Sequence, residues 1–214
     1  NLERDEFRKL DGGNSSLRPQ ASVDALTPEQ IRAAVFEAGV VGMGGASFPT
    51  HIKLSPPKPV DTLIINGAEC EPYLTADYRL MLEKTEELLK GIAAVEKCLG
   101  VSKVIIAVED NKPEVIEKFK HLSLNTNYTL RVLKSSYPQG GEKQLIKNVL
   151  RKEVPSGKLP FDIGIVVQNV ATVFAMYEAL FLGKPLYERI VTVTGSPLRS
   201  PKNLRVRIGT PIKE

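Results

Sequence analysis

The stretch that decides the fold is IGIVVQNVATVFAMYEALF, residues 163–181. Its first part, Ile163 to Val167, is rich in β-branched residues and predicts a buried strand. Gln168 and Asn169 follow, and the apolar segment from residue 170 to 181 is long enough for a helix. A strand that passes through a polar junction into a helix is the repeating unit of an α/β fold.

The same alternation continues towards the N-terminus. The residue patterns predict strands over 61–65, 101–108 and 128–133, and helices over 27–39, 76–98, 112–119 and 141–150. The first of these helices has a capping box formed by Thr27 and Gln30, with Pro28 at its first position. We therefore expect an α/β, Rossmann-like layered domain with a largely parallel sheet over residues 27–187.

The two ends of the chain differ from this centre. Residues 1–26 are polar and include the run DGGNSS, so we interpret them as a linker or arm. From residue 188 onward there are two strand patterns and two prolines but no helix pattern. Residues 188–214 are therefore predicted to begin a second, β-rich unit.

Composition and charge argue against several functions. The net charge of +4 is spread along the chain and aromatic residues make up 6%, so we expect no nucleic-acid partner. The most apolar stretch is interrupted by Gln168, Asn169 and Glu178, so no direct membrane span is expected. Two cysteines are too few for a Cys-rich zinc or iron–sulfur site, and the two histidines do not cluster with metal-ligating residues, so we predict no metal bound by this chain.

A glycine-rich segment, GMGGASFPTHIK at residues 42–53, is the first candidate for ligand binding. Gly42, Gly44 and Gly45 allow the backbone to approach a ligand closely, and its N–H groups can hold a phosphate. Lys53 adds a positive charge. The alternative is a plain glycine-rich connector.

Three further motifs each lie just past a predicted strand. They are NGAECEPY at 66–73, YPQGGEK at 137–143 and VQNVAT at 167–172. In parallel sheets such loops meet at one edge, where ligands bind. Asn66, Glu69 and Glu71 offer groups for ribityl or ribose hydroxyls, although the two glutamates could instead be solvated surface residues. For the last two motifs the alternative is helix capping, by Asn169 in particular.

Taken together, GMGGASFPTHIKL, INGAECEPYLTADYRLM, YPQGGEKQLI and VPSGKLPFDIGIVVQNVATV resemble the RnfC family, a component of the Rnf ion-translocating electron-transport complex. The resemblance extends from about Thr27 to the end of the chain. The pattern is more distantly similar to the FMN- and NADH-binding flavoprotein subunit of respiratory complex I. Met43 and Ala68 stand where that subunit has an arginine and an aspartate.

The resemblance implies a set of cofactor-binding residues and no catalytic side chain. The implied contacts with flavin or nucleotide are Gly42, Gly44, Gly45, Lys53, Asn66, Glu69, Glu71, Tyr137, Gly140, Gly141, Glu142, Asn169 and Thr172, with Phe48 and Phe161 as nucleotide-stacking residues. It further implies that residues from about Ile190 begin a β-grasp domain of the soluble-ligand-binding type. The 4Fe-4S clusters of full-length RnfC belong to a Cys segment that these residues do not contain.

By the same resemblance, the chain handles FMN and NAD(H) in ferredoxin:NAD oxidoreduction coupled to ion translocation. The implied partners are other Rnf subunits and ferredoxin-like carriers, at the cytoplasmic face of the bacterial inner membrane as a peripheral subunit. One alternative is a cobalamin-reductase-type flavoprotein, which shares the flavin module. The other is a non-catalytic assembly module of a membrane complex, whose glycine loops bind only partner subunits and which would not take up FMN.

Overall fold

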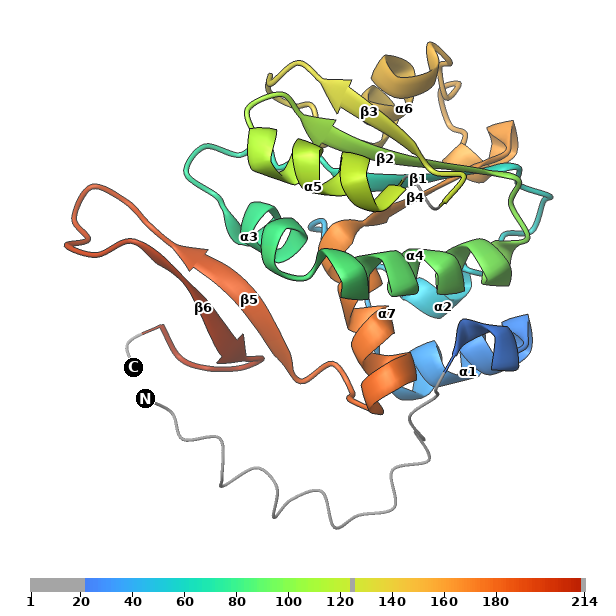
Figure 1. The fold of residues 1–214 in the computed structure, drawn as a ribbon, viewed down its shortest axis with the longest axis horizontal. Helices are drawn as coiled ribbons and strands as arrows, with labels where there is room; N and C mark the ends of the chain where they lie inside the picture. The colour runs from blue at the N-terminus through green and yellow to red at the C-terminus, as the bar shows by residue number, and fades with distance from the viewer. Residues whose placement is uncertain (1–21, 124–125, 213–214) are drawn as a thin grey trace.

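The computed structural model describes residues 22–123 and 126–212 and has a central sheet of four parallel strands in the order β3-β2-β1-β4 (Figure 1). The strands are β1 (Thr62–Gly67), β2 (Lys103–Glu109), β3 (Thr129–Leu133) and β4 (Ile165–Asn169). The helices are α1 (Pro28–Glu37), α2 (Thr50–Lys53), α3 (Ala76–Glu83), α4 (Thr85–Leu99), α5 (Pro113–Ser123), α6 (Glu142–Leu150) and α7 (Val170–Leu182), with short 3₁₀ turns at Val23–Ala25 and Pro160–Ile163. The predicted α/β class and parallel sheet are confirmed.

The helices cover the two faces of the sheet unequally. Because parallel crossovers are right-handed, the steps from β1 to β2 to β3 place α3, α4 and α5 on one face. The step from β3 back to β4 runs the other way, and α6 lies on the opposite face (Figure 1). Alternate strand residues follow this division: Leu63 and Ile65 join the larger core with α4 and α7, whereas Ile64 packs with α6.

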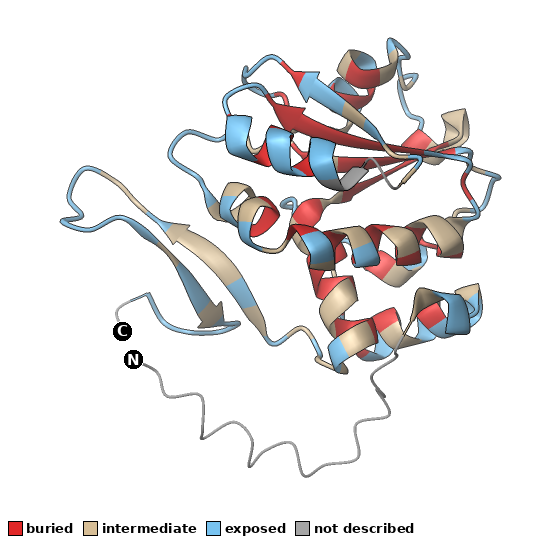
Figure 2. Ribbon diagram, viewed as in Figure 1, coloured by how far each residue is buried: buried red, intermediate tan, exposed pale blue. Residues whose placement is uncertain are grey.

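Strand β3, at the edge of the sheet, is largely exposed, whereas β1, β2 and β4 are buried on both faces, as Figure 2 shows. This burial explains why their sequences read as continuous β-branched and aliphatic runs without polar alternation. In α1, Thr27 accepts a hydrogen bond from Gln30 N, and the Gln30 side chain accepts one from Thr27 N at 2.8 Å, so the predicted capping box is confirmed.

Strand β1 extends further than its sequence pattern indicates. The predicted strand ends at residue 65, and the Asn-Gly pair that follows is typical of a turn, but Asn66 and Gly67 lie inside β1 and pair with Ala107 and Val108 of β2. A Cβ at residue 67 would lie 2.6 Å from the Met81 sulfur and 3.0 Å from the Ala107 carbonyl oxygen, so glycine here suits close packing within the strand.

The helix expected over 76–98 is two helices, α3 and α4, which meet at Lys84. The buried Thr85 hydroxyl donates to the Met81 carbonyl at 2.6 Å. In an uninterrupted helix that carbonyl would accept the Thr85 N–H, so the side chain replaces the backbone bond where the helix breaks.

After α7 the chain forms an antiparallel hairpin of β5 (Glu188–Val193) and β6 (Lys202–Arg207). The predicted strands at the end of the chain are thus present, while their assignment to a β-grasp domain stays a prediction. The linker predicted over 1–26 falls mostly outside the described residues; within it, Val23–Ala25 form a 3₁₀ turn. No helix in the described ranges is long and apolar enough to cross a bilayer.

Candidate functional site

The candidate site lies at the carboxyl ends of β1 and β4. The chain adds β2 and β3 on one side of β1 and then β4 on the other, so the strand order reverses between β1 and β4. Asn66 and Asn169, the last polar residues of these two strands, are direct partners in the register. A reversal of this kind opens a crevice at the carboxyl edge, where α/β proteins bind ligands.

Two adjoining cavities occupy this edge. The first cavity has a volume of about 690 Å³ and the second about 450 Å³. Both volumes are in the range of cofactor and small-molecule sites. Five residues line both cavities, so the two cavities adjoin one another there: Gly44, Asn66, Gly140, Gly141 and Asn169.

The glycine loop contributes Gly44 to this shared lining. It is closed at its base by a hydrogen bond from Gly42 N to Phe48 O at 2.8 Å. Met43 N donates to Thr172 Oγ1 at 2.9 Å, which ties the loop to α7. A Cβ at Gly44 would lie 3.6 Å from the Asn169 Cβ. The loop that precedes the sheet in sequence is therefore packed against the end of its last strand.

Asn66 joins the second and third predicted motifs. Its Nδ2 donates to Gly140 O at 2.9 Å, and its Oδ1 accepts from Ala68 N at 3.1 Å. A Cβ at residue 140 would lie 2.5 Å from Ala68 O, so only glycine allows this approach. The Gly140 N–H also faces Cys70 Sγ at 3.3 Å. The NGAEC and PQGG segments are thus fixed to one another.

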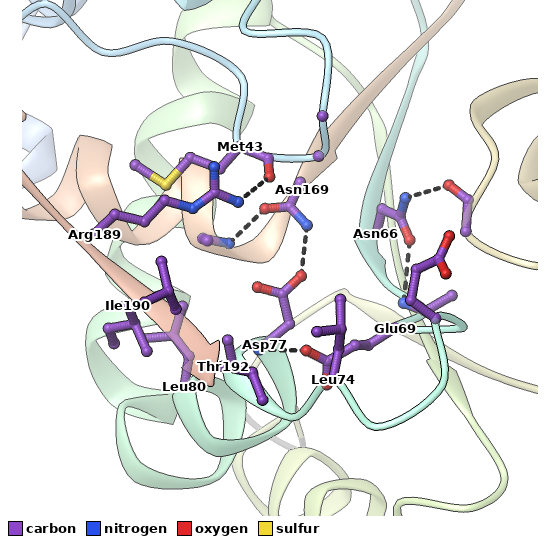
Figure 3. A pocket seen from close by; sticks show the side chains of 18 of the residues that line it. Met43, Asn66, Glu69, Leu74, Asp77, Leu80, Asn169, Arg189, Ile190 and Thr192 are labelled. Atoms are coloured by element: carbon purple, nitrogen blue, oxygen red, sulfur yellow. Dashed lines mark hydrogen bonds between the residues drawn. The ribbon is translucent and has the colours of Figure 1, made fainter. Parts of the chain in front are cut away.

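Asn169 caps α7 and also faces the first cavity (Figure 3). Its Oδ1 accepts from Ala171 N at 2.9 Å and Thr172 N at 3.4 Å, which confirms the capping interpretation. Its Nδ2 donates to Asp77 Oδ2 at 2.7 Å. Both polar atoms of the amide are therefore engaged within the protein. By contrast, the N-terminus of α6, at Gly141, has no side-chain cap among the described residues, so its first-turn N–H groups are free to meet an anion.

The two glutamates of the second motif have different environments. The Glu69 carboxylate accepts from Asp77 N at 2.9 Å and Tyr78 N at 3.1 Å, so it caps α3 from eight residues upstream. Glu71 is exposed, and both glutamates line the first cavity. Tyr137 also lines it, with 69% of its surface exposed.

The second cavity is mostly apolar, with a few polar groups. Phe48 and Phe161 line it, as the resemblance implied for stacking residues. Lys53 Nζ and Glu142 Oε1 form an ion pair at 2.7 Å at its edge. Two buried polar atoms in its wall, Gln168 Nε2 and Thr50 Oγ1, have no hydrogen-bond partner in the described part of the chain. Buried groups of this kind are rare, and these two are available for a hydrogen bond to a ligand in the cavity.

Asp77 is the most perturbed carboxyl group of the site. Its pKa is raised from 3.8 to about 6, chiefly by burial and to a smaller extent by the Glu69 carboxylate, while the hydrogen bond from Asn169 and the Arg189 cation act to lower it. Near neutral pH this side chain therefore changes its charge within reach of the first cavity. Carboxyls with such shifts are concentrated at functional sites.

The structure brings together the site residues predicted from sequence. Each predicted residue lines one or both cavities. That they contact flavin or nucleotide stays a prediction. Sequence reasoning missed Asp77, Arg189 and Thr50 as site residues, and it noted Gln168 without assigning it. Only Gln168, a polar residue at the end of a buried strand, carries a signal that could have been used. Among the described residues, no group of three or more His, Cys, Asp or Glu side chains could hold a metal ion.

Comparison with known proteins bears on this site directly. Curated relatives include the C subunit of the proton-translocating ferredoxin:NAD(+) oxidoreductase complex of Clostridium ljungdahlii, 49% identical over 88% of this chain and 42% of the relative. The C subunit of the ion-translocating oxidoreductase complex of Rhodobacter capsulatus is 47% identical over 92% of this chain and 38% of the relative. The resemblance to RnfC is thereby confirmed, and the chain spans less than half the length of these relatives.

A solved NAD+-reducing NiFe-hydrogenase in the H2-reduced state superposes with a TM-score of 0.66 at 24% identity, over 77% of this chain and 33% of that one. This likeness supports the fold. Residues 35–178, which include all four motifs, match the model of the Nuo51 FMN-binding domain. This matched segment covers well over half of the sequence and contains both strands of the reversal point, so the chain belongs to the family of Nuo51 FMN-binding domains.

Proposed function

We propose that this chain is the flavin-binding core of an Rnf-type electron-transport subunit, and that it passes electrons between NAD(H) and FMN. The observation that carries this proposal is the convergence of four motifs, distant in sequence, on two cavities that share a wall at the reversal point of the sheet. A flavin and a nicotinamide must lie against one another to exchange a hydride, and two neighbouring cavities allow that arrangement.

The first cavity fits FMN. Its floor is bare backbone at Gly44, Gly45 and Gly140, which can approach a flat ring closely. Free N–H groups at the start of α6 can bind the phosphate, since a helix N-terminus favours anions. Glu71 is free to accept hydrogen bonds from ribityl hydroxyls, whereas Glu69 uses its carboxylate on α3.

The second cavity fits the nicotinamide nucleotide. Phe48 and Phe161 provide aromatic surface for a base, and Lys53 supplies a cation near a phosphate. The unpartnered Gln168 amide can donate to a carbonyl or phosphate oxygen of the ligand.

The side chains of this site orient ligands and do not need to carry a proton for the reaction. Bound FMN supplies both two-electron and one-electron chemistry, which suits exchange between NAD(H) and iron–sulfur clusters. Asn66 and Asn169, which line both cavities, are each fixed by hydrogen bonds within the protein. Since the curated relatives are subunits of ion-translocating complexes, we further propose that the chain works with other Rnf subunits and ferredoxin-like carriers, peripherally at the cytoplasmic face of the membrane.

A titration of the 214-residue chain with FMN, followed by visible absorbance and flavin fluorescence, tests the proposal. We expect one FMN per chain and bleaching of the bound flavin on addition of NADH. Gly44→Val should weaken FMN binding at least tenfold, because the valine methyl groups would project from the wall into the cavity. The fold should tolerate the change, since a Cβ at residue 44 would lie 3.6 Å from its nearest neighbour, the Asn169 Cβ.

Thr129→Val is the matched control, because residue 129 begins β3 and is exposed at the opposite edge of the sheet. This variant should bind FMN as the wild type does. Equal FMN affinity of wild type and Gly44→Val would show that the glycine loop is not the flavin site. FMN binding without bleaching by NADH would contradict the assignment of the second cavity.

A further inference from the structure

The β5–β6 hairpin forms one wall of the first cavity. Residues 188–192 of β5 and Arg205 of β6 line it. The hairpin is held there by the segment that leads into α3: Thr75 N donates to Thr192 Oγ1 at 3.1 Å, and Asn203 Nδ2 donates to Thr75 O at 3.1 Å. The sequence predicts a separate unit from residue 188, yet in space these residues close the side of the candidate flavin site (Figure 3).

One hairpin side chain reaches the glycine loop itself. An Arg189 guanidinium nitrogen donates to the Met43 carbonyl at 2.7 Å (Figure 3). Met43 N is bonded on its other side to Thr172 Oγ1 at 2.9 Å. The residue directly before Gly44 is thus held by both of its backbone polar groups, from α7 and from β5.

This double attachment matters because the next two residues have no side chains. Gly44 and Gly45 line the cavity, and glycine adopts many backbone conformations of similar energy. Met43, whose side chain is 9% exposed, is therefore the nearest fixed point for the loop. The Arg189 cation also lowers the pKa of Asp77, the carboxylate that accepts a hydrogen bond from Asn169. Arg189 therefore lies within electrostatic reach of Asp77.

We propose that Arg189 is a positioning residue of the flavin site, which holds the Met43–Gly45 backbone in the conformation that receives the isoalloxazine ring. The hairpin is then part of the flavin site and not an independent appendage. This inference rests on the proposed function, since it concerns the same cavity. The inference predicts that a substitution of Arg189, on β5, alters flavin binding. The side chain acts indirectly, through its hydrogen bond to the Met43 backbone.

FMN titration of Arg189→Gln, Arg189→Lys and Lys202→Gln tests this role. Lys202 is an exposed cation on the same hairpin that does not line the cavity, so it is the matched control. We expect Arg189→Gln to raise the Kd for FMN about tenfold, the effect of one charge-assisted hydrogen bond, with partial recovery in Arg189→Lys. Lys202→Gln should bind within about twofold of wild type, as surface substitutions usually do.

Visible circular dichroism at saturating FMN separates positioning from general destabilisation. If Arg189 sets the loop conformation, the flavin bands of Arg189→Gln differ from those of wild type even when every site is filled. Thr172→Val removes the other attachment of Met43 and should change the bands in a similar way, whereas Lys202→Gln should keep the wild-type bands. These two variants carry the test if Arg189→Gln does not fold.

The outcomes are distinguishable. If wild type binds FMN and Arg189→Gln binds it with the same Kd and the same bands, the inference is wrong while FMN binding stands. If wild type does not bind FMN, the proposed function is wrong and this inference with it.

Discussion

Two buried polar atoms in the wall of the second cavity, Gln168 Nε2 and Thr50 Oγ1, have no hydrogen-bond partner among the residues that the structure describes. Gln168 and Thr50 are 2% and 1% exposed, so their unpaired atoms are not hydrated from the surface. Leaving such a group unbonded costs about 1–3 kcal/mol. A ligand that supplies the missing acceptor or donor recovers this free energy on binding, which gives affinity and orientation together.

Gln168→Leu should therefore increase the free energy of unfolding and weaken nucleotide binding. We expect a gain of about 1 kcal/mol without ligand, because the unsatisfied amide is replaced by an apolar group of similar size. Urea unfolding measures the first effect, and NADH titration of the FMN-loaded protein measures the second. A loss of stability without ligand would mean that the Gln168 amide has a partner after all.

The charge of the Asp77 side chain, and with it the charge of the site, changes with pH. Its pKa of about 6 lies above the ordinary 3.8, so the folded chain holds this proton more tightly than the unfolded chain. The resulting stabilisation is complete below about pH 3.8 and is lost as the pH rises to about 6. Wild type therefore loses stability over this range through Asp77.

Asp77→Asn should remove that loss and keep an oxygen for the Asn169 amide. Relative to wild type, we expect the variant to gain roughly 1–3 kcal/mol between pH 4 and pH 6.5, from a shift of about two pKa units. Urea unfolding at a series of pH values measures it. Glu86→Gln, at an exposed carboxylate of α4, is the control. Parallel pH profiles of wild type and Asp77→Asn would contradict the raised pKa.

At the scale of secondary-structure elements, three helices that border the site, α3, α6 and α7, differ in how their N-terminal N–H groups are satisfied. The N-terminus of α7 is capped by Asn169, the preceding residue. That of α3 has no cap from Thr75, and Glu69 supplies one from the preceding loop. That of α6 begins at a glycine and keeps its N–H groups available. These differences leave an anion site at α6 alone among these three helices.

Glu69→Ala should destabilise the fold by about 1–2 kcal/mol, because two N–H groups of α3 lose their charged acceptor. Glu69→Gln should cost less, since its amide oxygen still accepts. Glu71→Ala, two residues away and exposed, should change stability by less than about 0.5 kcal/mol. Thermal or urea unfolding of the three variants decides the matter, and equal losses for Glu69→Ala and Glu71→Ala would argue against the cap.

At the scale of the whole molecule, a compact charge network joins the α/β layers to the hairpin. Lys184 lies between Glu178 of α7 and Glu188 of β5, at 2.6 Å and 2.5 Å. All three side chains are less than one-fifth exposed. Arg205 of β6 also reaches Glu188 at 3.3 Å. The network sets where the hairpin leaves α7, and so where Arg189 meets the glycine loop.

Lys184→Met should remove the cation shared by Glu178 and Glu188, while Glu188 keeps its ion pair with Arg205. We expect a loss of about 1–3 kcal/mol, reduced from the value for a fully buried pair because water reaches the group. Hydrogen exchange followed by mass spectrometry should show faster exchange in β5 and β6 and unchanged exchange in β1 and β2. Lys202→Met, on the same hairpin but outside the network, should alter neither. Unchanged hairpin exchange in Lys184→Met would show that other contacts hold the hairpin.

The sequence by itself determined the elements and the class of the fold. Caps such as Thr27, β-branched runs such as 101–108 and the polar ends of strands are local features, and local features predict strands, helices and the loops between them. They also indicated that Asn66, Gly140 and Asn169 lie near strand ends that share one edge of the sheet. The break at Lys84 escaped prediction because it depends on how Thr85 bonds once it is buried.

Only the tertiary structure decided the strand order, the lining that the two cavities share, and which residues distant in sequence join the site. Asp77 and Arg189 enter the site through contacts with residues 92 and 146 positions away in the chain. No local pattern marks such a residue, because its role arises when the sheet closes and the hairpin returns to the glycine loop. Short-range propensities act along the chain, whereas cavities and their electrostatics depend on which distant segments the packed core brings together.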